Sequence, residues 1–338
     1  MLSQKIPFKN KRILVCPLDW GLGHTARCVP LIKALQEAGN AVVVGCNSSQ
    51  KDFLVAEISG VEFVELFGYE VKYSESVPLW MALLLQFRRL KSSVKREHQW
   101  LDSFLNEHKI DVVISDNRFG LYSSKVETVF VTHQVFIKAP FLSGHANSIN
   151  RSYIENFDAL WVADHEDEKN SLAGELSHGG HFHSGITYIG PLSRFTKKEI
   201  SSEKSYDVLI LLSGVEPQRT LLEEKCVSSL KNSGLKVCLV RGTNMSSGIN
   251  YPENFSAKNV VGSAELEGLL LSSKKIVCRS GYSSLMDLHT LGIKAVLIPT
   301  PGQTEQEYLA KYWGEKFRFV TLTQKEITAE SLLRAINA

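Results

Sequence analysis

The sequence lacks several features that would place the chain outside the ordinary globular proteins. No apolar run approaches the ~20 residues that a membrane span needs, and residues 1–11 are polar and basic, without the apolar core of a signal peptide. The net charge is only +2, which gives no electrostatic basis for binding nucleic acid. The six cysteines include no Cys-x-x-Cys pair, and several lie inside apolar runs. They are therefore expected to be buried thiols in a reducing, cytoplasmic compartment.

The pattern of apolar residues predicts two domains of the α/β class. The chain has 338 residues, more than one hydrophobic core usually holds. Short Val-, Ile- and Leu-rich runs alternate with segments of helical period, which is typical of buried parallel strands in Rossmann-like βαβ units. A stretch rich in Gly, Ser and His places the boundary near residue 190, giving domains 1–190 and 191–338. The expected strands are 12–16, 41–46, 61–66, 111–115, 128–132 and 159–163, then 206–212, 236–240, 259–261, 275–278 and 294–298.

A short glycine loop with a histidine follows the first expected strand. Gly21 and Gly23 allow a tight turn at the carboxyl end of that strand, where open α/β sheets bind ligands. The loop departs from the GxGxxG pattern of dinucleotide folds, and no acidic residue ends the next strand at 45–47, which argues against NAD. His24 beside an open cleft suits a general base, and the alternative is a histidine that only caps or packs against the helix.

Polar residues also end two further strands of the first half. Asp116 follows the strand at 111–115, at the same sheet edge as His24, where a carboxylate could orient the imidazole. The alternative is a turn or helix-capping role for Asp116. His133 and Gln134 follow the strand at 128–132, and either contact a substrate or form a polar strand end.

Three strand ends in the second half carry groups suited to a nucleotide. Gly214 and Arg219 lie at a helix start, where backbone N–H groups and a guanidinium would bind a diphosphate. Asp287, in the helix after the strand at 275–278, could accept hydrogen bonds from ribose or could lie on a solvated helix face. The strand at 294–298 leads into many side chains that bind hydroxyl groups. The remaining candidates at these strand ends are Arg279, Ser280, Gly281, Tyr282, Ser283, Gln306 and Glu307.

Four motifs in succession resemble those of the GT-B glycosyltransferases. They are Gly-x-Gly-His at 21–24, Ser-Gly-x-Glu-Pro-Gln-Arg at 213–219, Cys-Arg-Ser-Gly-Tyr-Ser-Ser-Leu-Met-Asp at 278–287, and Pro-Thr-Pro-Gly-Gln-Thr-Glu-Gln-Glu at 299–307. The chain is most similar to the family of the peptidoglycan N-acetylglucosaminyltransferase and its C-terminal domain. This resemblance implies two Rossmann-like domains whose parallel sheets face a central cleft. It also implies an inverting transfer from a UDP-sugar to a glycan, lipid-linked or small-molecule hydroxyl in cell-envelope polysaccharide synthesis, without a cofactor.

The same resemblance implies roles for single residues. The Ser280-Gly281 loop would bind the UDP diphosphate, and Asp287 matches the family's ribose-binding glutamate. The glutamine pair that holds the donor sugar matches Gln306 and Glu307, and the second residue is a departure that leaves the sugar open. His24 and Asp116 resemble the base dyad of UDP-dependent small-molecule glycosyltransferases, in which the histidine deprotonates the acceptor.

Other interpretations of the same sequence stay open. Residues 21–28 are also similar to the nucleotide-sugar hydrolases of nonulosonic acid synthesis, in which the histidine would activate water, and a non-catalytic nucleotide-sugar-binding protein is a third possibility. Segment 78–91 is apolar and then basic, and is either a helix at the inner face of the membrane or a buried core helix. His178, His181 and His183 lack the spacing of a zinc site, so no metal is expected.

Overall fold

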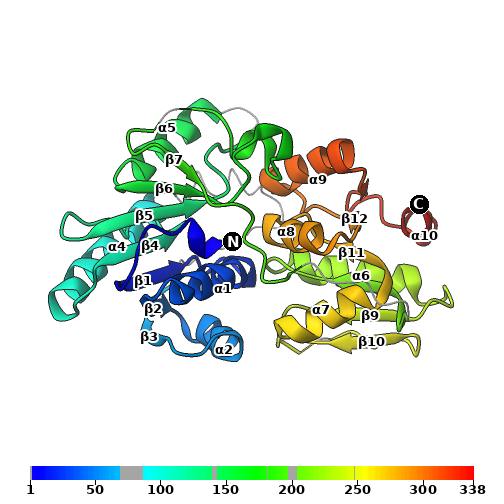
Figure 1. Cartoon of the computed structure of the whole chain (residues 1–338). Helices are drawn as coiled ribbons and strands as arrows, with labels where there is room; N and C mark the ends of the chain where they lie inside the picture. The colour runs from blue at the N-terminus through cyan, green and yellow to red at the C-terminus, as the bar shows by residue number, and fades with distance from the viewer. Residues whose placement is uncertain (1, 69–86, 139–142, 181, 197–203, 247) are drawn as a thin grey trace. The chain divides into compact units, whose positions relative to one another are not determined.

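The computed structural model describes the chain except for residues 1, 69–86, 139–142, 181, 197–203 and 247. The described part divides into two compact units, the first ending at Arg194 and the second beginning at Phe195. Each unit contains one parallel β-sheet with helices packed around it (Figure 1). The predicted α/β class, with two Rossmann-like sheets, is confirmed.

The first unit has seven parallel strands in the order β3-β2-β1-β4-β5-β6-β7. The strands are β1 (Arg12–Pro17), β2 (Ala41–Cys46), β3 (Glu62–Glu65), β4 (Val112–Asp116), β5 (Glu127–Thr132), β6 (Ala159–Val162) and β7 (Ile186–Tyr188). The helices are α1 (Leu22–Glu37), α2 (Ser48–Glu57), α4 (Phe87–Glu107) and α5 (Ser143–Ile154), with short 3-10 turns η1 (Leu2–Gln4), η2 (Glu168–Asn170) and η3 (Gly174–Leu176). The order reverses between β1 and β4, and open α/β sheets bind ligands at such a switch point.

The second unit has six parallel strands in the order β10-β9-β8-β11-β12-β13, so its switch point lies between β8 and β11. The strands are β8 (Tyr206–Leu211), β9 (Val237–Val240), β10 (Phe255–Lys258), β11 (Ser273–Cys278), β12 (Val296–Leu297) and β13 (Val320–Thr321). The helices are α6 (Gln218–Leu230), α7 (Ser263–Leu271), α8 (Tyr282–Leu291), α9 (Thr304–Phe317) and α10 (Ala329–Asn337).

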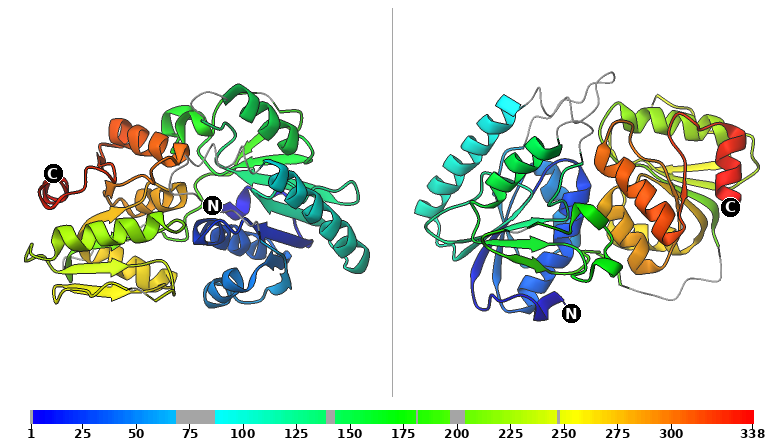
Figure 2. Two further views of the ribbon diagram at one scale, coloured as in Figure 1. Left: turned by 180° about the vertical axis from the view of Figure 1, so that it is seen from behind. Right: turned by 90° about the horizontal axis from the view of Figure 1, so that it is seen from above.

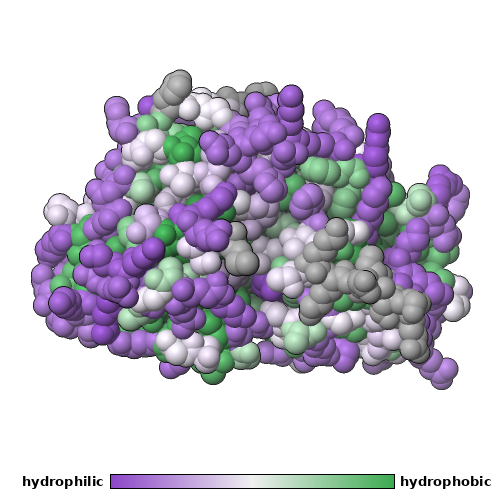
Figure 3. Space-filling view, viewed as in Figure 1, coloured by the Kyte–Doolittle hydropathy of each residue, from purple (hydrophilic) through white to green (hydrophobic). Residues whose placement is uncertain are grey.

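Helices on both faces explain the continuous apolar strands. Figure 2 shows helices flanking the sheet within each unit. Residues Ile13, Leu14 and Val15 of β1 have no exposed surface, and the apolar end of β11 is equally buried. The face in Figure 3 is mostly hydrophilic, with apolar residues in small separate groups. All six cysteines are buried free thiols, which confirms the expectation of burial.

Some boundaries differ from the prediction. The prediction of a strand at 259–261 is wrong, because the strand in this region is Phe255–Lys258. Its two central residues are exposed, so it lacks the apolar run on which the prediction depends. The short strands β7 and β13 have no predicted counterpart. Helix α1 begins at Leu22, so Gly23 and His24 belong to its first turn instead of the preceding loop.

The segment proposed to contact a membrane lies mostly outside the described residues. Of residues 78–91, only the last five are described, as the start of α4. None of the described helices is both long enough and apolar enough to cross a bilayer.

Candidate active site

The structure brings His24 and Asp116 together at the carboxyl edge of the first sheet. β1 and β4 pair in parallel with Pro17 opposite Asp116, so the first turn of α1 begins beside the end of β4. Nδ1 of His24 lies 2.9 Å from Oδ2 of Asp116. The carboxylate can only accept, so it holds the imidazole proton on Nδ1 and leaves Nε2 with a lone pair.

A buried arginine, for which the sequence motifs indicate no role, completes the cluster. Arg27 lies three residues after His24 on α1 and donates from Nε to Oδ1 of Asp116 at 2.9 Å, with a second contact from Nη2. Its Nη1 donates to Nδ1 of His133 at 2.7 Å. The side chains of Arg27 and Asp116 are each 1% exposed, whereas that of His24 is 17% exposed. His24 is therefore the member of this cluster that reaches solvent or substrate.

The local charges set the protonation of this cluster. Burial alone would raise the pKa of Asp116, but the charges of Arg27 and His24 and their hydrogen bonds outweigh it and lower the pKa to about 2. Burial lowers the pKa of His24, and the charge of Arg27 adds to that effect against the opposing attraction of Asp116. At neutral pH the pair is thus a carboxylate beside a neutral imidazole, the state that a general base requires.

The glycines and the polar strand end complete this sheet edge. Gly21 is the N-cap of α1 with a φ of 82°, a conformation that disfavours side chains, while an added Cβ would meet no atom within 4 Å. The backbone, and not lack of space, therefore requires glycine there. Gly23 lies in the first turn of α1. At the end of β5, the backbone N–H of Gln134 donates to Oγ1 of Thr132 at 2.9 Å.

The three loops expected to bind the donor meet at the carboxyl edge of the second sheet. Gly281 is the N-cap of α8 and supplies no side chain to cap the first N–H groups, a geometry that suits an anion. A Cβ on Gly281 would lie 3.9 Å from Nε2 of Gln306, and one on Gly214 would lie 3.9 Å from Oγ1 of Thr300. The hydroxyl of Ser280 donates to the carbonyl of Gln306 at 2.8 Å, which ties the loops after β11 and β12 together.

Two of the acidic and amide candidates of the second unit make hydrogen bonds that support the local structure. Oε1 of Gln306 accepts from the N–H of Thr300 at 2.9 Å, and Oε1 of Glu307 accepts from the N–H of Gly302 at 2.8 Å. Both side chains therefore brace the turn after β12. Asp287 is 8% exposed, so it does not lie on a solvated helix face. Tyr282 and Ser283 form the first turn of α8.

Arg219, expected to lie beside a diphosphate, and Arg279, a further donor-site candidate, are both buried and hydrogen bonded within the second unit. Arg219 donates to Glu216 at 2.6 Å and to Glu223 at 2.7 Å, because these carboxylates lie one helical turn on either side of it. Arg279 has no exposed surface and donates to the carbonyls of Ile298, Pro299 and Gln218. Burial lowers the pKa of Arg279 to about 10. From its buried position, Arg279 therefore connects the loops that follow β8, β11 and β12.

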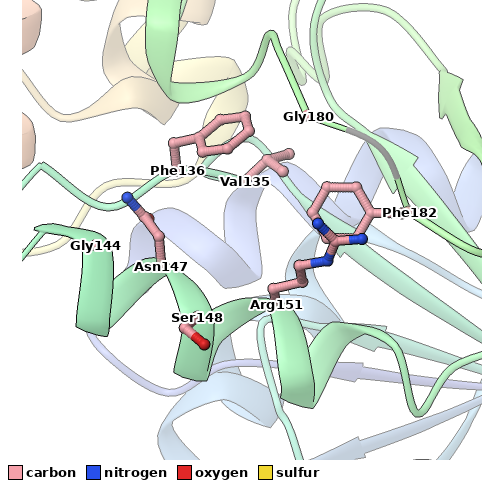
Figure 4. A pocket seen from close by; sticks show the side chains of 8 residues that line it. All are labelled: Val135, Phe136, Gly144, Asn147, Ser148, Arg151, Gly180 and Phe182. Atoms are coloured by element: carbon pink, nitrogen blue, oxygen red, sulfur yellow. The ribbon is translucent and has the colours of Figure 1, made fainter.

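A pocket of about 310 Å³ opens in the first unit just after the end of β5. Figure 4 shows Phe136 and Val135 above one side of it, with Arg151 beside Phe182 on the other. The Arg151 guanidinium lies 5.5 Å from the centre of the Phe182 ring and is neutralised by Glu155 at 2.8 Å. The pocket is thus aromatic with little net charge. Its remaining lining residues are Gly144, Asn147, Ser148 and Gly180.

The described histidines near residue 180 contact a hydroxyl group and a carboxylate. Nδ1 of His178 lies 2.8 Å from the hydroxyl of Ser177, and Nε2 of His183 lies 3.8 Å from a carboxylate oxygen of Glu155. His181 lies outside the described residues. Across the described ranges, no three His, Cys, Asp or Glu side chains are grouped so as to hold a metal ion.

Comparisons with known proteins agree with this architecture. Residues 224–338 match the model of the glycosyltransferase family 28 C-terminal domain. A protein of Methanosarcina acetivorans described as an uncharacterized glycosyltransferase is 22% identical over 326 residues, covering 88% of this chain and 81% of its own. The UDP-N-acetylglucosamine--N-acetylmuramyl-(pentapeptide) pyrophosphoryl-undecaprenol N-acetylglucosamine transferase of Desulforudis audaxviator is 36% identical over 76 residues, 22% of this chain and 20% of that protein.

Solved structures extend the likeness to both units. The spinosyn rhamnosyltransferase SpnG has a TM-score of 0.65 at 14% identity and covers 97% of this chain and 92% of its own. Arabidopsis thaliana UGT89C1 complexed with UDP-L-rhamnose has a TM-score of 0.62 at 14% identity, with 97% and 90% covered. At such identities the likeness is one of fold. The chain thus has the GT-B fold of these glycosyltransferases, and its residues 224–338 match the glycosyltransferase family 28 C-terminal domain.

Proposed function

We propose that this glycosyltransferase transfers a sugar from a UDP-sugar to a hydroxyl group with inversion at the anomeric carbon, and that His24 is the general base. The observation that carries the proposal is the 2.9 Å hydrogen bond between Nδ1 of His24 and the buried carboxylate of Asp116. This bond orients a neutral imidazole whose Nε2 can accept a proton, on the one side chain of the cluster that is partly exposed.

The proposed reaction is a single displacement. Nε2 of His24 takes the proton of the acceptor hydroxyl while its oxygen forms a bond to the anomeric carbon. The bond from that carbon to the diphosphate oxygen breaks, and UDP leaves with the bonding electrons. Asp116 stabilises the imidazolium that forms, as a buried carboxylate does in other histidine dyads.

On the donor side, the loops after β8, β11 and β12 are proposed to hold the nucleotide. The first N–H groups of α8, with Ser280 and Gly281, would face the diphosphate, since a helix N-terminus favours negative charge. Asp287 would accept from ribose hydroxyls, and Nε2 of Gln306 would reach the sugar. Arg279 would act beneath this surface by fixing the three loops. Similar folds have been solved with UDP-L-rhamnose and UDP-2fluoro-glucose, which supports a UDP-sugar donor.

On the acceptor side, we place part of the acceptor in the pocket after β5. Its position follows His133 and Gln134 directly in the chain, so it lies at the same sheet edge as the dyad. Two phenylalanine rings and an ion-paired arginine favour a ring-bearing, weakly charged group, as in a glycan, a small-molecule acceptor or the sugar of a lipid-linked one. A lipid-linked acceptor would add membrane contact through residues 78–91.

The function is tested by measuring UDP release from a panel of UDP-sugars, with and without a lipid and glycan extract as acceptor. Release that requires the extract, with a sugar-labelled product, is the expected result. Substantial release without acceptor would identify a hydrolase that uses the same histidine on water. Tight UDP-sugar binding without turnover on any acceptor would identify a binding protein instead.

Replacing Phe136 by alanine is expected to raise the KM for the acceptor about tenfold and to leave the donor KM unchanged. Loss of one aromatic contact costs about 1.4 kcal/mol, which corresponds to that factor. Phe53→Ala on α2 is the control, because Phe53 is also partly buried but does not line the pocket. Steady-state kinetics at varied acceptor concentration test this prediction. Equal acceptor KM values for Phe136→Ala and Phe53→Ala would show that this pocket does not bind the acceptor.

A further inference from the structure

Arg27 contacts both histidines of the first sheet edge, directly or through one carboxylate. One side of its guanidinium donates to Asp116, which in turn accepts from Nδ1 of His24. Its Nη1 donates to Nδ1 of His133 at 2.7 Å. A guanidinium has five donors and no acceptor, so the nitrogen that it contacts on His133 must be the one without a proton. The proton of a neutral His133 therefore lies on Nε2, opposite to the arrangement in His24.

We propose that Arg27 is a positioning residue that fixes opposite tautomers on the two histidines, so that the basic nitrogen of the site is Nε2 of His24 while the proton of His133 is held on Nε2. The second imidazole is then a hydrogen-bond donor and not a second base. The catalytic consequence rests on the proposed role of His24, while the tautomer assignment rests only on the hydrogen bonds of Arg27.

The electrostatic surroundings of His24 support this division of roles. The titratable and charged groups around it are Arg27 and Cys28 from α1, Asp116 from the end of β4, and His133 from the end of β5. Burial raises the pKa of the Cys28 thiol well above its usual range, so Cys28 stays neutral. Arg27 is thus a fixed positive charge in the group, and it disfavours a second positive charge on the imidazole of His24.

A planar fork is needed for this task, and lysine cannot replace it. Nε and Nη2 of Arg27 face Asp116 while Nη1 faces His133, so a single rigid group spans a carboxylate and an imidazole. Lysine keeps the positive charge but is a single point donor. Arg27→Lys therefore separates the effect of charge from the effect of geometry, whereas Arg27→Met removes both.

The test is long-range ¹H–¹⁵N NMR of the histidine side chains in the full chain, with the two signals assigned by His24→Gln and His133→Gln. The wild type should show Nδ1–H for His24 and Nε2–H for His133. Arg27→Lys should lose the single tautomer of His133. Lys33→Met, which removes an exposed positive charge from the same helix, should leave both signals unchanged. Nδ1–H on His133, or protonation of both its nitrogens at pH 7, would overturn the proposal in the wild type alone, even if a variant failed to fold.

The pH profile of kcat/KM supplies the second readout. The active form of His24 is neutral, so activity falls as pH drops through its pKa, and the charge of Arg27 helps to keep that pKa below 6.5. Arg27→Met should move this acid limb to higher pH and lower kcat roughly 10- to 100-fold through misplacement of the base, with the donor KM unchanged. Arg27→Lys should keep the acid limb nearer the wild-type position.

An unshifted acid limb in a folded Arg27→Met variant, together with an unchanged His133 tautomer, would refute the proposal. The proposed function can fail separately. If the wild type shows the two opposite tautomers but transfers no sugar from any donor, the arrangement of the histidines stands and the transferase assignment falls.

Discussion

His24→Ala is expected to lower kcat for sugar transfer about 10²- to 10⁴-fold, which is the usual contribution of a positioned general base. The substitution removes the only atom proposed to accept the proton of the attacking hydroxyl. It should not change UDP affinity, because the residues proposed to bind UDP belong to the second unit. A defect confined to kcat, with the dissociation constant of UDP unchanged by calorimetry, is therefore the specific signature of a lost base.

Three comparisons make this result informative. Asp116→Asn should also lower kcat strongly, since an amide can present its N–H to Nδ1 and thereby favour the wrong tautomer of His24. His145→Ala, which removes an exposed histidine of α5 in the same unit, should leave the rate unchanged. Added imidazole should partly restore His24→Ala, because it can occupy the vacated space and accept the proton. A His24→Ala rate within threefold of wild type would exclude His24 as the base.

The parts of the fold that the sequence predicts well are the buried central strands. The strand at Ala41–Cys46 is predicted with its observed bounds, because helices cover both sheet faces and every position but the first is buried. Edge strands carry no such signal. In Phe255–Lys258 the two central residues are exposed, so the strand has no continuous apolar run. The sequence pattern therefore predicts a strand at the nearby valines of 259–261 instead.

The residues of the candidate site also differ in how far the sequence predicts them, because some are marked by local patterns and others only by contacts with distant parts of the chain. His24 and Asp116 could be paired from the sequence because both follow strands, and the ends of parallel strands meet at one sheet edge. Arg27 was missed because its partners come from chain positions 89 and 106 residues away, and nothing local distinguishes it from another helix arginine. For Arg219 the signal was present, since Glu216 and Glu223 stand at the spacings of helical ion pairs.

The largest loss of stability is expected from Glu97→Ala. Glu97 on α4 accepts from Nε of Arg118 at 2.7 Å and from the N–H of Gly120 at 3.0 Å, and both members of the ion pair are fully buried. Arg118 also donates to the carbonyl of Pro17 at 3.2 Å, at the end of β1. Removing the carboxylate leaves a buried positive charge without its ion-pair partner, which costs about 3–5 kcal/mol. For a unit of this size, Tm should fall by roughly 6–20 °C.

Thermal and urea unfolding of the full chain measure this loss, and an exposed ion pair of the same unit provides the control. Glu62→Ala breaks the pair with Arg12, whose side chains are 51% and 41% exposed, and should cost less than about 1 kcal/mol. The double variant Glu97→Met with Arg118→Met should be more stable than Glu97→Ala, because it removes the buried charge instead of leaving it unpaired. If Glu97→Ala and Glu62→Ala were equally stable, burial would not govern the strength of these pairs. Because Arg118 holds the carbonyl of Pro17, the same buried pair also fixes the strand end from which the His24 loop departs.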